Sequence, residues 1–278
     1  MIKKVSTFFE KYWNHCILVK NSHYSSFGDK FKAFRILNIL FIKSIIHANP
    51  KKEITYKIFK YKVSAYSYAT LFYLFKEIYL SKEYYFESDK PDLKILDCGA
   101  NIGMSVLYFK TIYPKSEIIA FEPNPYAFAL LKKNIEQNKI EGVTLKNVGL
   151  ADKINNIEFF ISENKESLTG SLIQGRGGDN SIKIKTEKLS NYLKSANVDL
   201  VKMDIEGAEL DVFKELKESN VIQNAKRYII EYHHLIDKAK ANLSEFLLPI
   251  EENNFQYNIR TTFEDIGDFQ DILISAYK

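Results

Sequence analysis

The sequence predicts an α/β fold in which a doubly wound sheet of seven strands, mostly parallel, ends in an antiparallel hairpin and is preceded by a helical extension. From residue 93 onward, short apolar runs alternate with helix-like segments, and parallel strands need such crossovers. Near the C-terminus, FQYNIRT and DILISAY are joined by an acidic turn with no helix between them, so these two strands must be antiparallel. The 278 residues and the hydrophobic fraction of 46% allow a sizeable core.

The alternating segments define the expected elements in order. Strands are expected at LKILDCG, EIIAFEP, VTLKNVGL, IEFFI, IKIKTEKL, VDLVKMDI, KRYIIEYHH, FQYNIRT and DILISAY. Helices are expected over residues 102–112, 125–138, 208–216 and 238–248. Before them, ITYKIFKYKVSAY suggests one or two strands, and ATLFYLFKEIYL suggests a buried helix. We therefore place the main domain at residues 66–278.

Residues 1–65 form a basic, mainly helical extension in this prediction. Residues 1–90 carry 16 lysines and arginines against seven acids, a net charge of +9, whereas the rest of the chain carries −5. Such a segment can face phosphates, an acidic glycan or anionic lipid, or it can be a solvated basic surface. Peripheral contact with the inner face of a membrane is therefore an open alternative, and the oligomeric state is undetermined. The run RILNILFIKSII is interrupted by Lys43 and is too short to span a bilayer.

The two cysteines indicate a reducing compartment. Cys16 and Cys98 are widely spaced, so they make neither a disulfide framework nor a zinc signature. The N-terminus lacks a convincing signal-peptide core. We therefore expect a cytoplasmic protein.

The loop after the first strand of the main domain indicates the ligand. In an open α/β sheet the ligand lies beyond the carboxyl ends of the strands, where LDCGANIG ends. A dinucleotide fingerprint needs G-x-G-x-x-G, but Asn101 takes the second glycine place and Met104 the third. Asp97 would repel a pyrophosphate and attract an ammonium or a sulfonium. S-adenosylmethionine carries both cations and no phosphate, although a tight turn that needs glycine at Gly99 and Gly103 is the structural alternative.

Two further carboxylates fit an adenosine. Glu122 ends the second strand, where it can accept hydrogen bonds from both ribose hydroxyls. Asp152, after the third strand, can contact an adenine amino group, although Ala-Asp-Lys is equally ordinary turn chemistry.

Several motifs together resemble the FkbM family of S-adenosylmethionine-dependent methyltransferases. They are LDCGANIG, FEPNP, VGLADKINNIEF and, as the most specific, VDLVKMDIEGAE, and the similarity runs over about residues 75–231. The resemblance implies a class I methyltransferase fold and O-methylation of a hydroxyl on a sugar, a glycolipid or a polyketide. With it we predict these cofactor-binding residues: Asp97, Gly99, Ala100, Asn101, Gly103, Glu122, Pro123, Leu150, Asp152 and Asp204.

Catalytic candidates gather at the ends of the fourth and fifth parallel strands. A sugar hydroxyl is a poor nucleophile while protonated, so a neighbouring group must take its proton. We predict Asp204 or Glu206 for this role, with His233 as an alternative base because its ordinary pKa lies near neutrality. Glu209 can serve the site or complement its helix dipole, and Glu231 and His234 complete the titratable set.

Other features of this region leave alternatives open. A divalent metal on Asp204, Glu231 and a histidine is chemically possible, but the spacing is no metal signature and we predict none. Lys202, inside a strand, is expected to reach the crevice or to pair with Glu231. The glycine-rich residues 167–180 can form a lid or be plain disorder.

Two rival functions remain at this stage. A nucleic-acid methyltransferase would suit the basic N-terminus, but we find no Asn-Pro-Pro-Tyr-type base-flipping motif and expect no nucleic-acid partner. A non-catalytic adenosyl-ligand binder or membrane-associated scaffold would not need the acidic cluster. The leading prediction is an O-methyltransferase with a small-molecule or glycan acceptor.

Overall fold

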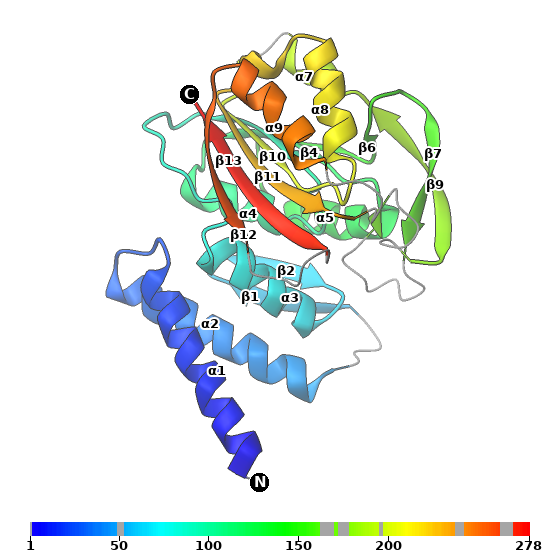
Figure 1. The fold of residues 1–278 in the computed structure, drawn as a ribbon. Coiled ribbons are helices and arrows are strands. Elements are labelled where there is room, and N and C mark those ends of the chain that lie inside the picture. Colours follow the sequence, from blue (N-terminus) through cyan, green and yellow to red (C-terminus); the bar gives the residue numbers. More distant parts are fainter. Residues whose placement is uncertain are drawn as a thin grey trace.

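The computed structural model describes residues 2–48, 53–161, 170–171, 178–194, 197–236, 242–261 and 269–278. Its main body is a twisted sheet covered by helices on both faces, and the N-terminal helices pack below one of these layers (Figure 1). None of the described helices combines the length and the apolar composition that a membrane span requires.

The main sheet has seven strands in the order β12-β13-β11-β10-β3-β4-β5. In chain order they are β3 (Lys94–Cys98), β4 (Glu117–Phe121), β5 (Val143–Lys146), β10 (Leu200–Met203), β11 (Arg227–His234), β12 (Gln256–Thr261) and β13 (Gln270–Tyr277). The inner pairs are parallel, and β13 runs antiparallel to both β11 and β12. The predicted doubly wound sheet with a terminal antiparallel hairpin is therefore confirmed.

Helices cover both faces because the central strands bury side chains on both sides. On one face lie α4 (Met104–Ile112) and α5 (Pro125–Gln137), whose apolar side chains share a core with Ile95 and Ile118. On the other face lie α8 (Glu209–Glu218) and α9 (Leu243–Glu252), which pack over Leu96, Val201 and Tyr228, and the short α7 (Ser190–Leu193) adjoins them. The helix α9 begins at Leu243, and residues 238–241 of the expected helix lie outside the described residues.

The N-terminal part of the chain joins the core of the main domain. It comprises α1 (Ile2–Asn21), α2 (Phe27–Ile46), the hairpin β1 (Ile54–Ile58) and β2 (Tyr61–Ala65), α3 (Tyr68–Leu74) and a π-helix, η1 (Phe75–Leu80). Leu37 and Leu40 of α2 are fully buried in the same hydrophobic cluster as Leu107 of α4. One continuous core therefore joins residues before and after position 65. The domain boundary between residues 65 and 66 stays a prediction.

Helix starts follow from local capping. Ser26 accepts a hydrogen bond from the Asp29 N–H at the start of α2, and Ser67 accepts one from the Thr70 N–H at the start of α3. At α5, Asn124 accepts from the Tyr126 N–H, and Pro125 follows at a position that tolerates proline. The FEPNP motif therefore ends β4 and begins α5 within five residues.

The expected strand VTLKNVGL is split, which corrects the sequence prediction. Only β5 belongs to the main sheet, and β6 (Gly149–Leu150) pairs with β9 (Asn180–Glu187) in a second sheet of order β6-β9-β7-β8. At the break, the Asn147 side chain donates to the Glu122 and Pro123 carbonyls that follow β4. The remaining strands are β7 (Asn156–Ile161) and β8 (Gly170–Ser171). Most of the predicted lid, residues 167–180, lies outside the described residues.

Candidate active site

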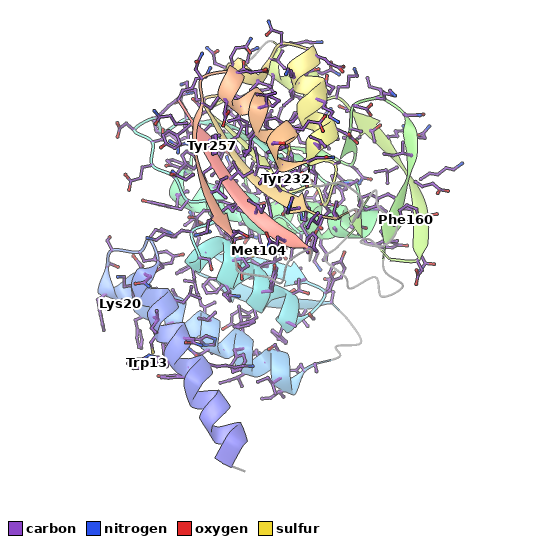
Figure 2. All side chains as sticks on the ribbon, viewed as in Figure 1. Trp13, Lys20, Met104, Phe160, Tyr232 and Tyr257 are labelled. Atoms are coloured by element: carbon purple, nitrogen blue, oxygen red, sulfur yellow. The ribbon has the colours of Figure 1, made fainter. Side chains whose placement is uncertain are left out.

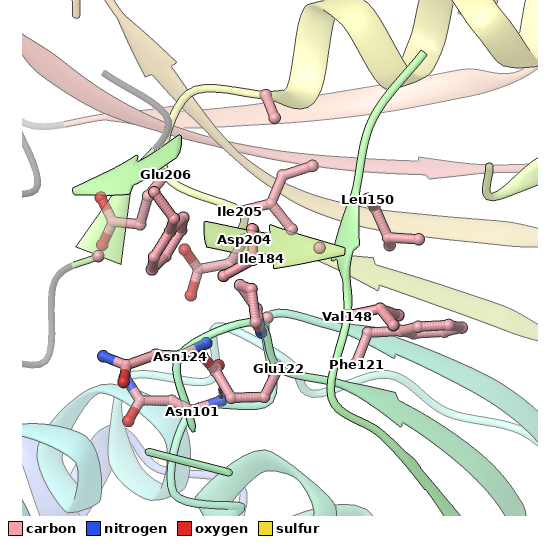
Figure 3. A pocket seen from close by; sticks show the side chains of 16 residues that line it. Asn101, Phe121, Glu122, Asn124, Val148, Leu150, Ile184, Asp204, Ile205 and Glu206 are labelled. Carbon is pink, nitrogen blue, oxygen red and sulfur yellow. Dashed lines mark hydrogen bonds between the residues drawn. The ribbon is translucent and has the colours of Figure 1, made fainter. Parts of the chain in front are cut away.

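A cavity opens at the carboxyl ends of β3, β4 and β10, as expected for an open α/β sheet. Figure 3 shows Glu122 and Asn101 on one wall and Asp204 and Glu206 on another. The cavity has a volume of about 60 Å³. Of the predicted residues, these line it: Gly99, Asn101, Glu122, Pro123, Leu150, Asp204 and Glu206.

The loop after β3 is shaped by a close approach of two backbones. The N–H groups of Gly99 and Ala100 both donate to the Phe121 carbonyl, at 3.0 and 2.9 Å, which ties the loop to β4. Gly99 has a φ of +84°, and a Cβ there would lie 1.7 Å from the Asp204 carbonyl oxygen. Only glycine fits this position, because the two strand ends would otherwise collide. The structural need for glycine and a ligand site thus coexist in one loop.

Glu122 is a buried carboxylate held by backbone donors. Its Oε2 accepts from the Asn101 N–H and its Oε1 from the Asn124 N–H, both at 2.8 Å. Burial raises the pKa of Glu122 to about 7, although the two N–H bonds act in the opposite direction. The carboxylate is therefore fixed in place and close to its titration point at neutral pH.

The charge of the cavity lining fits S-adenosylmethionine better than a dinucleotide. Asp204, Glu206 and Glu122 line it, and no lysine or arginine does so among the described residues. A pyrophosphate would need cations or a row of free N–H groups there, whereas a sulfonium and an ammonium are attracted by carboxylates. The Glu122 carboxylate and a described lining without lysine or arginine therefore match an adenosyl sulfonium.

Four predicted cofactor residues do not line the cavity. Asp97 is fully buried behind the loop, and its carboxylate accepts from the Ser105 hydroxyl at 2.5 Å. Gly103, with a φ of +88°, starts α4, and Ala100 is buried beside it. Asp152 is exposed and pairs with Lys153. Direct contact of these four with a cofactor stays a prediction.

Lys202 is buried and contacts both the loop after β3 and Asp204 at the end of β10. Its ammonium donates to the Gly99 carbonyl at 2.7 Å and lies 3.5 Å from carboxylate oxygens of both Asp97 and Asp204. It also lies 5.0 Å from the ring centre of Tyr84. The alternative of an ion pair with Glu231 is wrong, because closer carboxylates take the ammonium. A buried charge so paired fixes the loop positions around it.

The catalytic candidates meet around His233. Its Nε2 lies 3.3 Å from Glu206 Oε2 and 4.0 Å from Asp204 Oδ1, and its Nδ1 lies 2.8 Å from Glu209 Oε1. Burial lowers the pKa of His233, but the carboxylates of Glu209 and Glu206 outweigh it and raise the pKa well above its ordinary value. His233 is therefore a cation at neutral pH. His234 takes the opposite side of β11, where its ring neighbours Tyr232 at 6.1 Å.

Glu209 shapes the loop that carries Glu206. Its carboxylate accepts from the N–H groups of Ile205 and Gly207 at 3.1–3.2 Å. Glu206 has a φ of +54°, a left-handed conformation that costs an ordinary residue roughly 1–2 kcal/mol. The Glu209 contacts offset that cost, so the spacing in DIEGAE serves loop geometry as well as charge.

Metal ligation has two geometric candidates among the described residues. Ligand atoms of Asp204, Glu206 and His233 lie within 4.8 Å of one another, as do those of Glu231, His233 and Asp271. His233 belongs to both sets, and its Nδ1 already forms a hydrogen bond with Glu209 Oε1. The prediction that the site holds no metal stays a prediction.

The sequence prediction missed several residues of the site. Tyr84 is buried, and its hydroxyl donates to Asp204 Oδ2 at 3.3 Å. The family-like stretch FKEIYLSKEYYF contains Tyr84 and is the one signal that could have indicated it. Phe159 and Ile184 close the cavity from the second sheet, and no local pattern indicates this.

Comparison with known proteins gives the family. A family profile described as "Methyltransferase FkbM domain" matches residues 97–257. "Methyltransferase 1" of Beauveria bassiana is 31% identical over 169 residues, which cover 53% of this chain and 68% of that protein. "2-O-methyltransferase NoeI" of Sinorhizobium fredii is 32% identical over 148 residues, 47% of this chain and 60% of that protein. "Hexuronic acid methyltransferase AglP" of Haloferax volcanii is 30% identical over 154 residues, 54% of this chain and 60% of that protein.

The matched region contains the glycine loop, Glu122 and the whole DIEGAE loop, so the comparison and the geometry concern the same part of the molecule. The chain belongs to the FkbM family of methyltransferases, and its methyl donor is S-adenosylmethionine.

Proposed function

We propose that this protein transfers a methyl group to a hydroxyl of a sugar, a glycolipid or a related natural product. The observation that supports the proposal is the placement of Asp204 and Glu206 on the lining of the cavity that also contains Glu122. A methyl acceptor on the carboxylate side would meet a donor whose adenosine lies on the Glu122 side. The printed names of NoeI, a 2-O-methyltransferase, and AglP, a hexuronic acid methyltransferase, support the acceptor class.

The reaction requires one bond exchange and one proton transfer. When bound, S-adenosylmethionine supplies an electrophilic methyl carbon, and S-adenosylhomocysteine remains after the carbon–sulfur bond breaks. The acceptor oxygen forms the new bond to carbon and loses its proton to a carboxylate of the protein. Asp204 suits this role because it lines the cavity and is held by the Tyr84 hydroxyl and the Lys202 ammonium.

His233 serves the site as a positioning residue in this proposal. A histidine whose pKa is raised well above its ordinary value already carries its proton at neutral pH, so it is a poor base. Its contact with Glu206 instead orients that carboxylate toward the acceptor. Glu206 is then a second acceptor-binding carboxylate beside Asp204.

Methyl transfer from radiolabelled S-adenosylmethionine to a panel of sugars, sugar phosphates, extracted glycolipids, RNA and DNA tests the function. We expect a labelled product that mass spectrometry identifies as a methyl ether. Asp204→Asn should lower turnover by about 10²–10⁴-fold, the range for a lost general base, while S-adenosylhomocysteine still binds. Glu158→Gln, which removes an exposed carboxylate of β7, is the matched control. Label found only in RNA or DNA would replace this proposal with its nucleic-acid rival.

Location and membrane contact also belong to the proposal. Both cysteines are free thiols, which supports a reducing, cytoplasmic compartment. Trp13 on α1 and Phe27 on α2 are 67% and 86% exposed, which supports peripheral contact with a membrane, and Figure 2 shows Trp13 at the surface of the helical pair. Sedimentation with anionic liposomes tests this, and binding that a Trp13→Ala, Phe27→Ala double variant leaves unchanged would remove these side chains from it.

A further inference from the structure

A polar trough runs along one face of the terminal three strands. Alternate residues of β11 and β13 share this face, and their pairs are His233 with Asp271, Glu231 with Leu273, and Arg227 with Tyr277. Arg260 of β12 lies opposite Leu273 on the same face. Two cavities, of about 400 and 300 Å³, occupy this face, and both are lined by Arg260 and Leu273. The two cavities adjoin at these shared residues and are together called the groove, and Asp271 of the first cavity lies 3.8 Å from His233 Nε2.

The first cavity is lined by carboxyl groups. Glu77 of the π-helix, Glu83, Glu231 and Asp271 surround it, together with the Tyr73 ring. Burial and the Glu77 carboxylate raise the pKa of Glu83 to about 10, so Glu83 is protonated at neutral pH. Burial followed by the Asp204 charge raises the pKa of Glu231 to about 8. This end therefore offers both hydrogen-bond donors and acceptors, as a polyhydroxylated ligand requires.

The second cavity is lined by cations and by no carboxylate among the described residues. Lys82, Arg227 and Arg260 line it with the rings of Tyr85 and Tyr277. The Arg260 Nη1 donates to the Ser81 carbonyl at 2.9 Å, which holds its guanidinium across the groove. The Arg227 guanidinium lies 5.2 Å from the ring centre of Phe86 and 5.8 Å from that of Tyr277. In the described part of the chain, none of these three cations forms an ion pair, so they are available to an anion.

The strand register gives the length of the groove. A strand rises about 3.3 Å per residue. Arg260 is level with Leu273, two residues along β13 from Asp271, which corresponds to roughly 7 Å. Arg227 is level with Tyr277, six residues along, which corresponds to roughly 20 Å. A ring placed beside Glu231 and Asp271 thus meets the level of Arg260 about one sugar ring away.

We propose that this groove binds the acceptor, and that the acceptor is an anionic saccharide: a hydroxyl-bearing ring at the Glu231 end with a phosphate or a carboxylate held by Arg260, at the start of the basic cavity that Arg227 and Lys82 also line. The inference rests on the proposed function, whose site opens at the same strand ends. Guanidinium groups recognise both anions through paired N–H donors. The negative charge then sets which sugars are methylated, since a neutral sugar supplies no anion to these three cations.

Calorimetric titration of the full chain, with and without saturating S-adenosylhomocysteine, tests the proposal. The probes are glucose, glucose 1-phosphate, glucuronic acid and inorganic phosphate. We expect glucose 1-phosphate or glucuronic acid to bind at least about tenfold more tightly than glucose, because a charge-assisted bidentate contact is the stronger kind. Whichever acid binds more tightly identifies the anion. Arg260→Gln should remove most of that preference and Arg227→Gln a smaller part of it, whereas Lys132→Gln, on the exposed face of α5, should preserve it.

The outcomes separate the two proposals. If glucose and both acids bind equally, or if the preference for acids survives the loss of both arginines, the proposal of an anionic acceptor is overturned. Binding of S-adenosylhomocysteine in the same experiment would leave the proposed function intact. Inorganic phosphate that binds as tightly as the sugar acids, and equally in Lys132→Gln and Arg260→Gln, would indicate an adventitious ion only and also overturn it. If acids bind as expected but S-adenosylhomocysteine does not, the proposed function fails and the groove remains an anion site.

Discussion

Binding of the adenosyl ligand should depend on the ionisation of Glu122. Its two carboxylate oxygens accept from the Asn101 and Asn124 N–H groups and face the cavity. Ribose hydroxyls donate hydrogen bonds to a carboxylate but find a weaker acceptor in the protonated acid. Because burial raises the pKa of Glu122 to about 7, neutral pH divides the ligand-free protein between both forms.

The pKa sets the magnitude of the effect. With a pKa of about 7, roughly one molecule in eleven carries the charged form at pH 6 and roughly ten in eleven at pH 8. A ligand that binds only the charged form therefore has a Kd about tenfold larger at pH 6, which corresponds to ~1.4 kcal/mol. Glu122→Gln removes the charge, and hydrogen bonds to charged groups contribute about 1.5–3 kcal/mol, so its Kd at pH 8 should rise about 10–150-fold. Its Kd should also be independent of pH.

Isothermal titration at pH 6, 7 and 8 and constant ionic strength measures both effects. S-adenosylhomocysteine is the main ligand, and 5′-methylthioadenosine, which has neither an ammonium nor a carboxylate, separates titration of the protein from titration of the ligand. Glu158→Gln is the matched control because that carboxylate is exposed on β7. A wild-type Kd that stays constant from pH 6 to pH 8, or the same pH profile in Glu122→Gln, would refute the reasoning.

Three further predictions concern stability and the loop. Gly99→Ala should abolish S-adenosylhomocysteine binding and lower the Tm, since its Cβ would lie 1.7 Å from a carbonyl oxygen. Gly28→Ala, whose Cβ would lie 4.0 Å from the Ser26 Oγ, should leave both unchanged or stabilise the protein slightly. Glu209→Gln breaks a buried pair and should cost about 3–5 kcal/mol in urea unfolding, and NMR should show a lower pKa for His233. Because the pKa of His233 is raised in the folded protein, the stabilisation by the Glu209–His233 pair is fully present below pH 6.5 and is lost only as the pH rises through the raised pKa. A loss of stability in Glu209→Gln that occurs only at alkaline pH would contradict this reasoning. Leu37→Ala should lower the free energy of unfolding by about 2–5 kcal/mol, because Leu37 is fully buried. Ile45 is 60% exposed on the same helix, so Ile45→Ala should change it by no more than about 0.5 kcal/mol. Equal losses in the two variants would show that α2 does not pack into the core.

The site residues that strand ends supply were predictable from the sequence. Apolar runs of four to five residues located β3, β4 and β10, and parallel strands end at one edge of a sheet, so Gly99, Glu122 and Asp204 had to meet. The two motif glycines were also predictable, because their positive φ angles follow from the tight turn between strand and helix. The antiparallel hairpin followed from the short connection between β12 and β13.

The side-chain partners of these residues were not predictable, because they depend on segments far apart in the chain. Lys202 donates to Gly99 across 103 positions and pairs with Asp97, which moves Asp97 from the expected ligand surface to the support behind it. Tyr84 reaches Asp204 across 120 positions, and the break between β5 and β6 depends on contacts of one asparagine with the neighbouring strand end.

The sequence by itself determined the fold class, the sheet edge that carries the site and the acidic residues at that edge, because periodicity and strand ends are local properties. The tertiary structure alone decided which carboxylates face the cavity, that His233 contacts both Glu206 and Glu209, and that the β11–β13–β12 face carries a groove with separate acidic and basic ends. Those features arise from strand register and burial, since a charge's partner and its pKa are set by neighbours that only the packed chain brings within a few ångströms.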